Sequence, residues 1–275
     1  MRAFRLFIFL FILLGRLHFV LAAQDDYVED LPQGAKMDWS NLELSIRSLG
    51  SPPGRIKVLD DAYPLARKDA EEKAQTKFLQ TLSLIRISEL ETLGALMKHD
   101  AKLKNLVEKE AHQFKVVDSI YYSNGTLELI LKMPLHPVLA HLFEMKENSP
   151  AKIPVKKKGR KVYSGLIVDT SGLVYYPVLA PKLLAEDGLE LYGSKNVRGD
   201  AMLHHGVVRY SRSVKDAKEG ERMGSNPLVV KALRLGADNA LVLPSYESLQ
   251  LRQSELNLLF LEEGNVIIVI PADRS

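Results

Sequence analysis

The stretch "FKVVDSIYYSNGTLELILKMP", from Phe114 to Pro134, predicts a β-hairpin. Two runs rich in β-branched and aliphatic residues flank Asn124-Gly125, a dipeptide that suits a type I′ turn because both positions tolerate positive φ. Together with Thr126 the pair also spells an N-glycosylation sequon, which we interpret as turn chemistry only. The hairpin therefore supplies two strands of a sheet.

A long helical pattern precedes the hairpin. From Pro64, the run "PLARKDAEEKAQTKFLQTLSLIRI" places Ala66, Ala70, Ala74 and Phe78 four residues apart, on one face of a helix. Small side chains on that face let the helix axis approach another surface closely. We predict a helix packed on a sheet, and the alternative is a helix–helix assembly seam.

Three further segments complete the first half of the chain. Leu42–Gly50 alternates apolar and polar residues, which is typical of a half-buried strand. Glu89–Ala111 carries a second helical pattern. Residues 23–37 are acidic and interrupted by proline and glycine, so we predict an irregular leader there. Residues 38–146 are then an N-terminal α+β domain.

Residues 147–161, "ENSPAKIPVKKKGRK", predict a basic linker between two domains. One interpretation is a patch that binds the phosphates of lipid or nucleic acid. A solvated linker is favoured, because no aromatic residue is interleaved for base stacking.

The second half contains strand patterns at both of its ends. "VYSGLIVD" (162–169) predicts one strand, and "NVIIVI" (265–270) predicts a strand buried on both faces. Between them, "PKLLAEDGLELYG" (181–193) predicts a hairpin that turns at Glu186-Asp187-Gly188, and "HGVVRYS" (205–211) predicts another strand.

Two helices are also predicted in this half. "NPLVVKALRLGADNALVLP" places Asn226 as a helix cap and Pro227 at the first helical position, followed by a strand at Ala240–Leu243. "ESLQLRQSELNLLFLEEG" (247–264) predicts a helix that stops at Gly264. Residues 162–275 are therefore a C-terminal domain. The predicted fold class is α+β: two small mixed-sheet domains, each with helices packed on one face, after a signal peptide.

The first 22 residues, "MRAFRLFIFLFILLGRLHFVLA", predict that signal peptide, because a basic start, an apolar core and small residues follow in order. An uncleaved membrane anchor is the alternative. Arg16 and His18 interrupt the apolar run, which leaves fewer than the roughly 20 residues that a spanning helix needs. Cleavage removes three of the 37 Lys and Arg and no acid, so the mature chain is near neutral and gives no case for nucleic-acid binding.

The chain contains no cysteine. This excludes disulfides, thiolate metal sites, a cysteine nucleophile and the lipobox of an acylated lipoprotein. An exported, disulfide-free chain of this size fits a bacterial periplasm, where outer-membrane association is an open alternative. No second long apolar run exists, so we expect membrane contact to be peripheral at most.

The stretch "YSGLIVDTSGLVYYP" (163–177) raises the question of a catalytic carboxylate at Asp169. An aspartic protease needs two carboxylates that share a proton, each in an Asp, Thr or Ser, Gly turn. Here Ser171 displaces Gly172 by one position, and no second copy of the motif exists. We therefore predict that Asp169 closes a local turn toward Ser171 or Gly172.

Other motifs predict no catalytic, cofactor-binding or metal-binding residues. The adjacent His204 and His205 would point to opposite faces of a strand, and His136 and His141 are poorly spaced as ligands. The sequence contains neither a glycine-rich phosphate loop after a strand nor a Gly-x-Ser-x-Gly elbow.

The run "ARKDAEEKAQTKFLQTLSLI", between a strand and a hairpin, resembles the N-terminal module of the FlgP and FlgT proteins. These exported proteins form outer rings and basal disks around bacterial flagellar motors. The resemblance covers about residues 40–135, and this chain lacks the lipobox cysteine of the FlgP-like lipoproteins. In the second half, "YSGLIVDTSGL", "APKLLAEDGLELYG" and "NPLVVKAL" resemble domains of uncharacterised bacterial envelope proteins, with the TolB and CsgG folds as looser analogies.

These resemblances imply scaffold or assembly work and carry no catalytic residues. We therefore expect a non-enzymatic periplasmic structural or assembly protein of an envelope machine, associated with a flagellar motor. Expected partners are other envelope or flagellar-motor proteins and further copies of the chain, without a cofactor or nucleic acid. The alternative is a periplasmic hydrolase or ligand-binding protein with a pocket between its domains.

Overall fold

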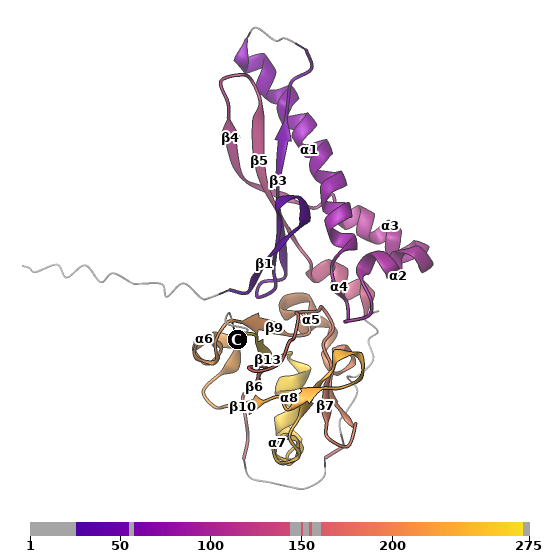
Figure 1. Cartoon of the computed structure of the whole chain (residues 1–275), viewed down its shortest axis with the longest axis vertical. Coiled ribbons are helices and arrows are strands. Elements are labelled where there is room, and N and C mark those ends of the chain that lie inside the picture. The colour runs from indigo at the N-terminus through magenta and orange to yellow at the C-terminus, as the bar shows by residue number, and fades with distance from the viewer. Residues whose placement is uncertain (1–25, 55–57, 144–149, 151–153, 156–160, 272–275) are drawn as a thin grey trace, which may run out of the picture.

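The computed structural model describes residues 26–54, 58–143, 150, 154–155 and 161–271. Figure 1 shows two bodies stacked along the long axis, the first coloured indigo to pink and the second orange to yellow. The predicted signal peptide and most of the predicted basic linker lie outside the described residues. Within the described part of the chain, no helix has both the length and the apolar character to cross a membrane.

The first domain is an antiparallel sheet with one long helix across one face. The strand order is β1-β2-β3-β5-β4. The elements are β1 (Val28–Leu31), β2 (Ala35–Asp38), β3 (Glu43–Gly50), α1 (Leu59–Ser83), α2 (Leu93–His99), α3 (Ala101–Glu110), β4 (Lys115–Tyr121), β5 (Leu127–Pro134) and α4 (His136–Leu142), with a 3-10 turn at Pro32–Gly34. Helix α1 begins at Leu59 rather than at Pro64.

The alanine face of α1 packs directly on β3, as predicted. Ala66, Ala70, Ala74 and Phe78 are fully buried, and Ser48 Oγ of β3 donates to the Ala70 carbonyl at 2.7 Å. A larger side chain on this face would hold the helix away from the strand and break that contact. The alternative of a helix–helix seam on this face is therefore wrong.

The predicted hairpin is present, but its turn differs from the prediction. Strands β4 and β5 pair antiparallel up to Tyr121 and Leu127. Of the Asn124-Gly125 pair only Gly125 has a positive φ, 84°, and its N–H donates to the Tyr122 carbonyl at 2.9 Å. This geometry is a type I turn followed by a left-handed glycine, rather than a type I′ turn.

Two other predictions for the first domain need correction. Residues 28–37 of the supposed irregular leader belong to the β1–β2 hairpin, which ends at Asp38, because Ala35 and Met37 alternate into the core. The single helix predicted at Glu89–Ala111 is two helices. Asp100 separates them, since its side chain accepts hydrogen bonds from the backbone N–H groups of Lys102 and Leu103 and so starts α3.

The second domain contains a parallel sheet and a smaller mixed sheet. Their strand orders are β10-β6-β13-β9 and β11-β12-β7-β8. The elements are β6 (Gly165–Asp169), β7 (Leu183–Ala185), β8 (Glu190–Tyr192), α5 (Gly199–His205), β9 (Arg209–Ser211), α6 (Val214–Glu219), β10 (Pro227–Lys231), β11 (Arg234–Leu235), β12 (Leu241–Leu243), α7 (Ser245–Leu251), α8 (Leu256–Glu262) and β13 (Val266–Val269), with 3-10 turns at Ser194–Asn196, Glu221–Met223 and Ala237–Asn239.

The predicted strands of this domain are confirmed at β6, β7, β8, β9, β12 and β13. All four residues of β13 are buried, as expected for a strand between two parallel neighbours. In place of the single helix predicted at 247–264 there are two, α7 and α8, before Gly264, which has a φ of 67°.

The helix predicted after Asn226 is wrong, because residues 227–235 form β10 and β11. Leu228 and Val230 are buried while their neighbours along β10 are more exposed, which is the two-residue alternation of a strand. Asn226 caps no helix, and its side-chain amide donates to the Val162 carbonyl at 2.8 Å. Pro227 is the first residue of a strand at the sheet edge, a position that proline tolerates.

Helices lie on both faces of the parallel sheet. On one face, Ile167 and Ile267 pack with Ala217 of α6. On the other face, Leu166 belongs to the main core together with Phe260 of α8. The expectation of helices on a single face therefore holds for the first domain but not for the second. Parallel strands require crossover connections, and these cover both faces.

Candidate functional site

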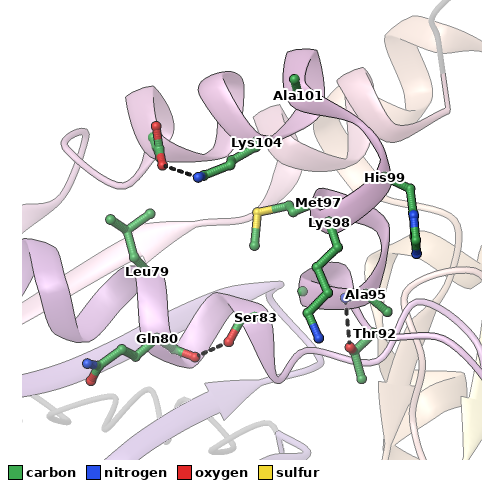
Figure 2. A pocket seen from close by; sticks show the side chains of 12 residues that line it. Leu79, Gln80, Ser83, Thr92, Ala95, Met97, Lys98, His99, Ala101 and Lys104 are labelled. Atoms are coloured by element: carbon green, nitrogen blue, oxygen red, sulfur yellow. Dashed lines mark hydrogen bonds and ion pairs between the residues drawn. The ribbon is translucent and has the colours of Figure 1, made fainter.

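A large open hollow lies between α1, α2 and α3. Its volume is about 760 Å³, and its lining residues are Leu79, Gln80, Ser83, Thr92, Gly94, Ala95, Met97, Lys98, His99, Ala101, Lys104 and Glu108. Figure 2 shows Met97 between α1 and α3, with Lys98 and Lys104 bordering the hollow on either side. We call this feature the α1–α3 groove.

The groove depends on a close contact between the end of α1 and the start of α2. A Cβ atom added to Gly94 would lie 2.7 Å from the Ser83 carbonyl oxygen. Thr92 caps α2 by accepting a hydrogen bond from the Ala95 N–H at 3.2 Å, and the Leu93 N–H donates to the Ile85 carbonyl at 2.9 Å. These contacts fix α2 against α1 and hold the groove open toward α3.

The groove combines an apolar floor with a basic border. Leu79, Ala95 and Met97 are only partly buried. Lys98 has no ion-pair partner among the described residues, and the ion pair of Lys104 with Glu108, at 3.8 Å, is exposed and therefore weak. This lining suits an apolar segment that also carries negative charge.

Tyr210 of β9 forms one part of the contact between the two domains, and the packing of α5 on α4 forms another. Ser40 Oγ accepts a hydrogen bond from the Tyr27 N–H at 2.7 Å and donates to the Tyr210 carbonyl at 2.6 Å. The Tyr210 ring meets Trp39 edge-on at 5.9 Å, and its hydroxyl donates to the Val178 carbonyl at 2.7 Å. Sequence reasoning singled out none of these residues, because their roles depend on partners far along the chain.

Arg86 makes a further connection between the domains. Its guanidinium pairs with Glu29 at 2.7 Å, donates to the Pro177 carbonyl at 3.0 Å and lies over the rings of Trp39 and Tyr176. The Leu179 N–H donates to its backbone carbonyl at 2.9 Å. The Arg86–Glu29 pair lies within the first domain, whereas the hydrogen bonds to Pro177 and Leu179 and the contact with the Tyr176 ring cross to the second. A separate ion pair, Arg209 with Asp26 at 3.1 Å, also joins the two bodies.

Two small cavities are lined by residues of both domains. One measures about 50 Å³ and the other about 10 Å³. Pockets for small-molecule ligands usually measure about 300–1,000 Å³. Neither cavity can therefore serve as the inter-domain pocket of a hydrolase or ligand-binding protein.

Comparison with known protein families gives a match for one segment of the chain. Residues 165–273 match the family model of the second domain of Treponema pallidum Tp0624. The match runs from the first residue of β6 past the end of β13, so we call this segment the Tp0624-type domain. No curated protein matches the chain. The segment resembles a domain of a bacterial protein, as predicted, whereas the resemblance of residues 40–135 to FlgP and FlgT stays a prediction.

Asp169 closes a turn at the end of the first strand of the Tp0624-type domain, as predicted. Its Oδ1 accepts a hydrogen bond from the Ser171 N–H at 2.8 Å, and its Oδ2 accepts one from the Ser171 hydroxyl at 3.0 Å. Gly172 follows with a φ of 86°. Both carboxylate oxygens are thus engaged in local turn bonding.

Replacement of Asp169 should separate the turn role from a chemical one. Asp169→Asn retains an acceptor for the Ser171 N–H, so we expect this change to alter the free energy of unfolding by less than about 0.5 kcal/mol. Asp169→Ala removes the acceptor and should cost about 1 kcal/mol. Urea unfolding of both variants measures this difference, and equal losses in both would contradict the turn role.

The histidines lie elsewhere than the sequence suggested. His204 and His205 end helix α5 rather than lying on a strand, and α5 packs against α4, which begins at His136. Burial lowers the pKa of His136, and the nearby Arg222, His205 and His204 lower it further. Among the described residues, no group of three possible ligands could hold a metal ion.

Arg222 of the Tp0624-type domain supports the same region by binding carbonyl groups. It donates to the carbonyls of His205, at 3.1 Å, and Gly264. Its Nε–H has no acceptor among the described residues, and burial lowers its pKa to about 10. We interpret Arg222 as a side chain that ties the end of α5 to the turn before β13.

Proposed function

We propose that this protein is a non-enzymatic structural or assembly protein of a bacterial envelope machine, and that it works by binding other proteins through the α1–α3 groove. The observation that carries the proposal is the form of this groove. It is open, bordered by lysines and floored by partly exposed apolar side chains. Grooves of this kind take a helix or an extended segment of a partner protein.

The joint between the domains supports the same proposal. A scaffold must hold its binding surfaces in a fixed relation, and the contacts of Tyr210 with Ser40 and Trp39 and of Arg86 with Pro177 join the two domains by buried and partly buried groups. An enzyme that closes around a substrate more often needs a hinge and a cleft. The two small cavities lined by both domains favour the scaffold over the hydrolase alternative.

The place of action is part of the proposal. The predicted signal peptide indicates a periplasmic location, where outer-membrane association is an open alternative. The match of residues 165–273 to a domain of a Treponema pallidum protein supports a bacterial setting. Within this setting, the resemblance of residues 40–135 to the FlgP and FlgT proteins favours a place at a flagellar motor. The expected partners are motor or envelope proteins and further copies of the chain.

Site-specific crosslinking in cells tests the proposed function. A photoreactive amino acid at Ala101, which lines the groove and is exposed, should crosslink a defined envelope protein or a second copy. Lys98→Glu with Lys104→Glu should abolish that product and impair motility or envelope integrity, because the border then repels an acidic partner. Lys102→Glu is the matched control, since Lys102 is exposed on α3 outside this groove.

The outcomes are distinct. As a control, a second photoreactive residue at exposed Lys68, about three helical turns before Gln80 on α1, should give no product that depends on Lys98 and Lys104. If the doubly substituted protein keeps both the crosslink and the cellular phenotype of the parent, the groove is not the binding surface. The proposed function then loses its main support.

A further inference from the structure

Helix α8 exposes an apolar pair on an otherwise acidic face. The exposed fractions of Leu256 and Leu259 are 56% and 53%, and their spacing places them one above the other on the helix. Glu255 and Glu262 lie on the same face, since positions 255, 259 and 262 are one and two helical turns apart. Among the described residues neither glutamate forms an ion pair, although Arg198, which pairs with the adjacent Glu263 at 2.9 Å, lies near Glu262.

Helix α7 also exposes a pair of large apolar side chains. Tyr246 and Leu249 are exposed to 66% and 43% and are again three residues apart. The two helices are consecutive, and Asn257 of α8 donates to the carbonyl of Gln250 in α7 at 3.2 Å. We call the exposed residues of this pair the α7–α8 face. Exposed large apolar side chains on two adjoining helices are typical of an interaction surface.

The α7–α8 face and the α1–α3 groove are complementary in charge, and both offer apolar side chains. The face carries leucines beside the two glutamates of α8. The groove is concave, with Leu79 and Met97 beside Lys98. The two surfaces belong to different domains, with α7 at the far end of the second domain and α2 and α3 beside α1 in the first (Figure 1).

We propose that the groove binds the α7–α8 face of a second copy of this chain. The inference rests on the proposed function and names the partner of the groove. Because the two surfaces differ, the contact is heterologous: each copy offers one unused groove and one unused helix face to the next. Repetition of such a contact produces a closed ring or an open filament rather than a two-fold dimer.

A charge-exchange experiment on the purified mature chain tests this assembly. The groove variant carries Lys98→Glu and Lys104→Glu, and the helix variant carries Glu255→Lys and Glu262→Lys. Each variant alone brings like charges together, so we expect its self-association to weaken at least about 100-fold. In an equimolar mixture every contact again joins opposite charges, and we expect the sedimentation of the parent protein to return.

Matched controls separate charge exchange from damage to the fold. Lys98, Lys104 and Glu255 are exposed and Glu262 is partly exposed, so circular dichroism should show parent-like folding for both variants. Leu256→Ser with Leu259→Ser removes the apolar contact without reversing charge. The leucine variant keeps an intact groove, and the groove variant keeps an intact α7–α8 face. A mixture of the two should therefore form a 1:1 dimer and nothing larger, because each protein has one surface that can still bind.

Three results would overturn the inference: a parent protein that stays monomeric as its concentration rises, variants that assemble like the parent, or a mixture of charge variants that stays monomeric. Failure here is distinguishable from failure of the proposed function. If the purified chain stays monomeric while the crosslink from Ala101 in cells still requires Lys98 and Lys104, the groove binds a different protein and only the self-assembly is wrong.

Discussion

Replacement of Gly50 by alanine is expected to destabilise the first domain more than any single change on α1. A Cβ atom at this position would lie 1.8 Å from the carbonyl oxygen of Ala66 and 2.7 Å from the backbone nitrogen of Ala70. Both obstacles are backbone atoms of a helix, so neither can rotate away. The whole helix must move off β3, and we expect a cost of about 3 kcal/mol or more.

The measurement is urea and thermal unfolding followed by circular dichroism. Ala70→Leu should cost about 1–3 kcal/mol, because its added volume also meets the sheet but has several rotamers. Thr76→Leu is the matched control on the exposed face of α1 and should change stability by less than about 0.5 kcal/mol. A Gly50→Ala protein as stable as the parent would contradict the close packing of α1 on β3.

The core of the first domain could be predicted because one local pattern determined it. Ala66, Ala70, Ala74 and Phe78 recur at helical spacing, and only a helix with a close partner uses three small residues in this way. The β4–β5 hairpin was equally local. Its turn type was not, because a glycine after asparagine permits two geometries and the strand register selects between them.

The second domain shows where local patterns fail. "NPLVVKAL" has a good helix start at Asn226-Pro227, yet the segment forms β10 because Leu228 and Val230 pair beside β6 and enter the core. That pairing joins residues about 60 positions apart in the chain, so tertiary contact overrides the cap signal. Helix α6 covers the second face of the parallel sheet. The prediction placed helices on one face only, and it failed for the same reason, because this packing also depends on tertiary contacts.

The candidate site was not predictable from spacing at all. The groove combines the end of α1 with α2 and α3, and its existence depends on the break at Asp100 and on the contact at Gly94. The predicted single helix at 89–111 would have had no such hollow. By contrast, the turn role of Asp169 was predictable, since aspartate followed by serine two residues later forms its bonds locally.

Replacement of Tyr210 by alanine is expected to have the largest effect on the joint between the domains. Tyr210 is 1% exposed, and its ring packs on Trp39 and Tyr27 of the first domain. Its hydroxyl also donates to the Val178 carbonyl and accepts from the Val178 N–H at 3.0 Å. Loss of this side chain should cost about 3–5 kcal/mol, as for other buried aromatic residues.

The way in which this variant unfolds is the decisive observation. If Tyr210 joins two domains that each have their own core, Tyr210→Ala should split one calorimetric transition into two, with the lower one including the second domain that has lost its packed ring. The variant Tyr210→Phe separates the hydroxyl from the ring. It keeps the ring but leaves the Val178 N–H and carbonyl without their partner, so it should cost about 1–3 kcal/mol and keep a single transition. Tyr121→Ala is the control, because its ring is 55% exposed and, within the described part of the chain, meets the Tyr63 ring alone, so it should cost at most about 1.5 kcal/mol. A Tyr210→Ala protein that still unfolds in one step at the temperature of the parent would show that the domains do not depend on this contact, and a scaffold with fixed surfaces would need another joint.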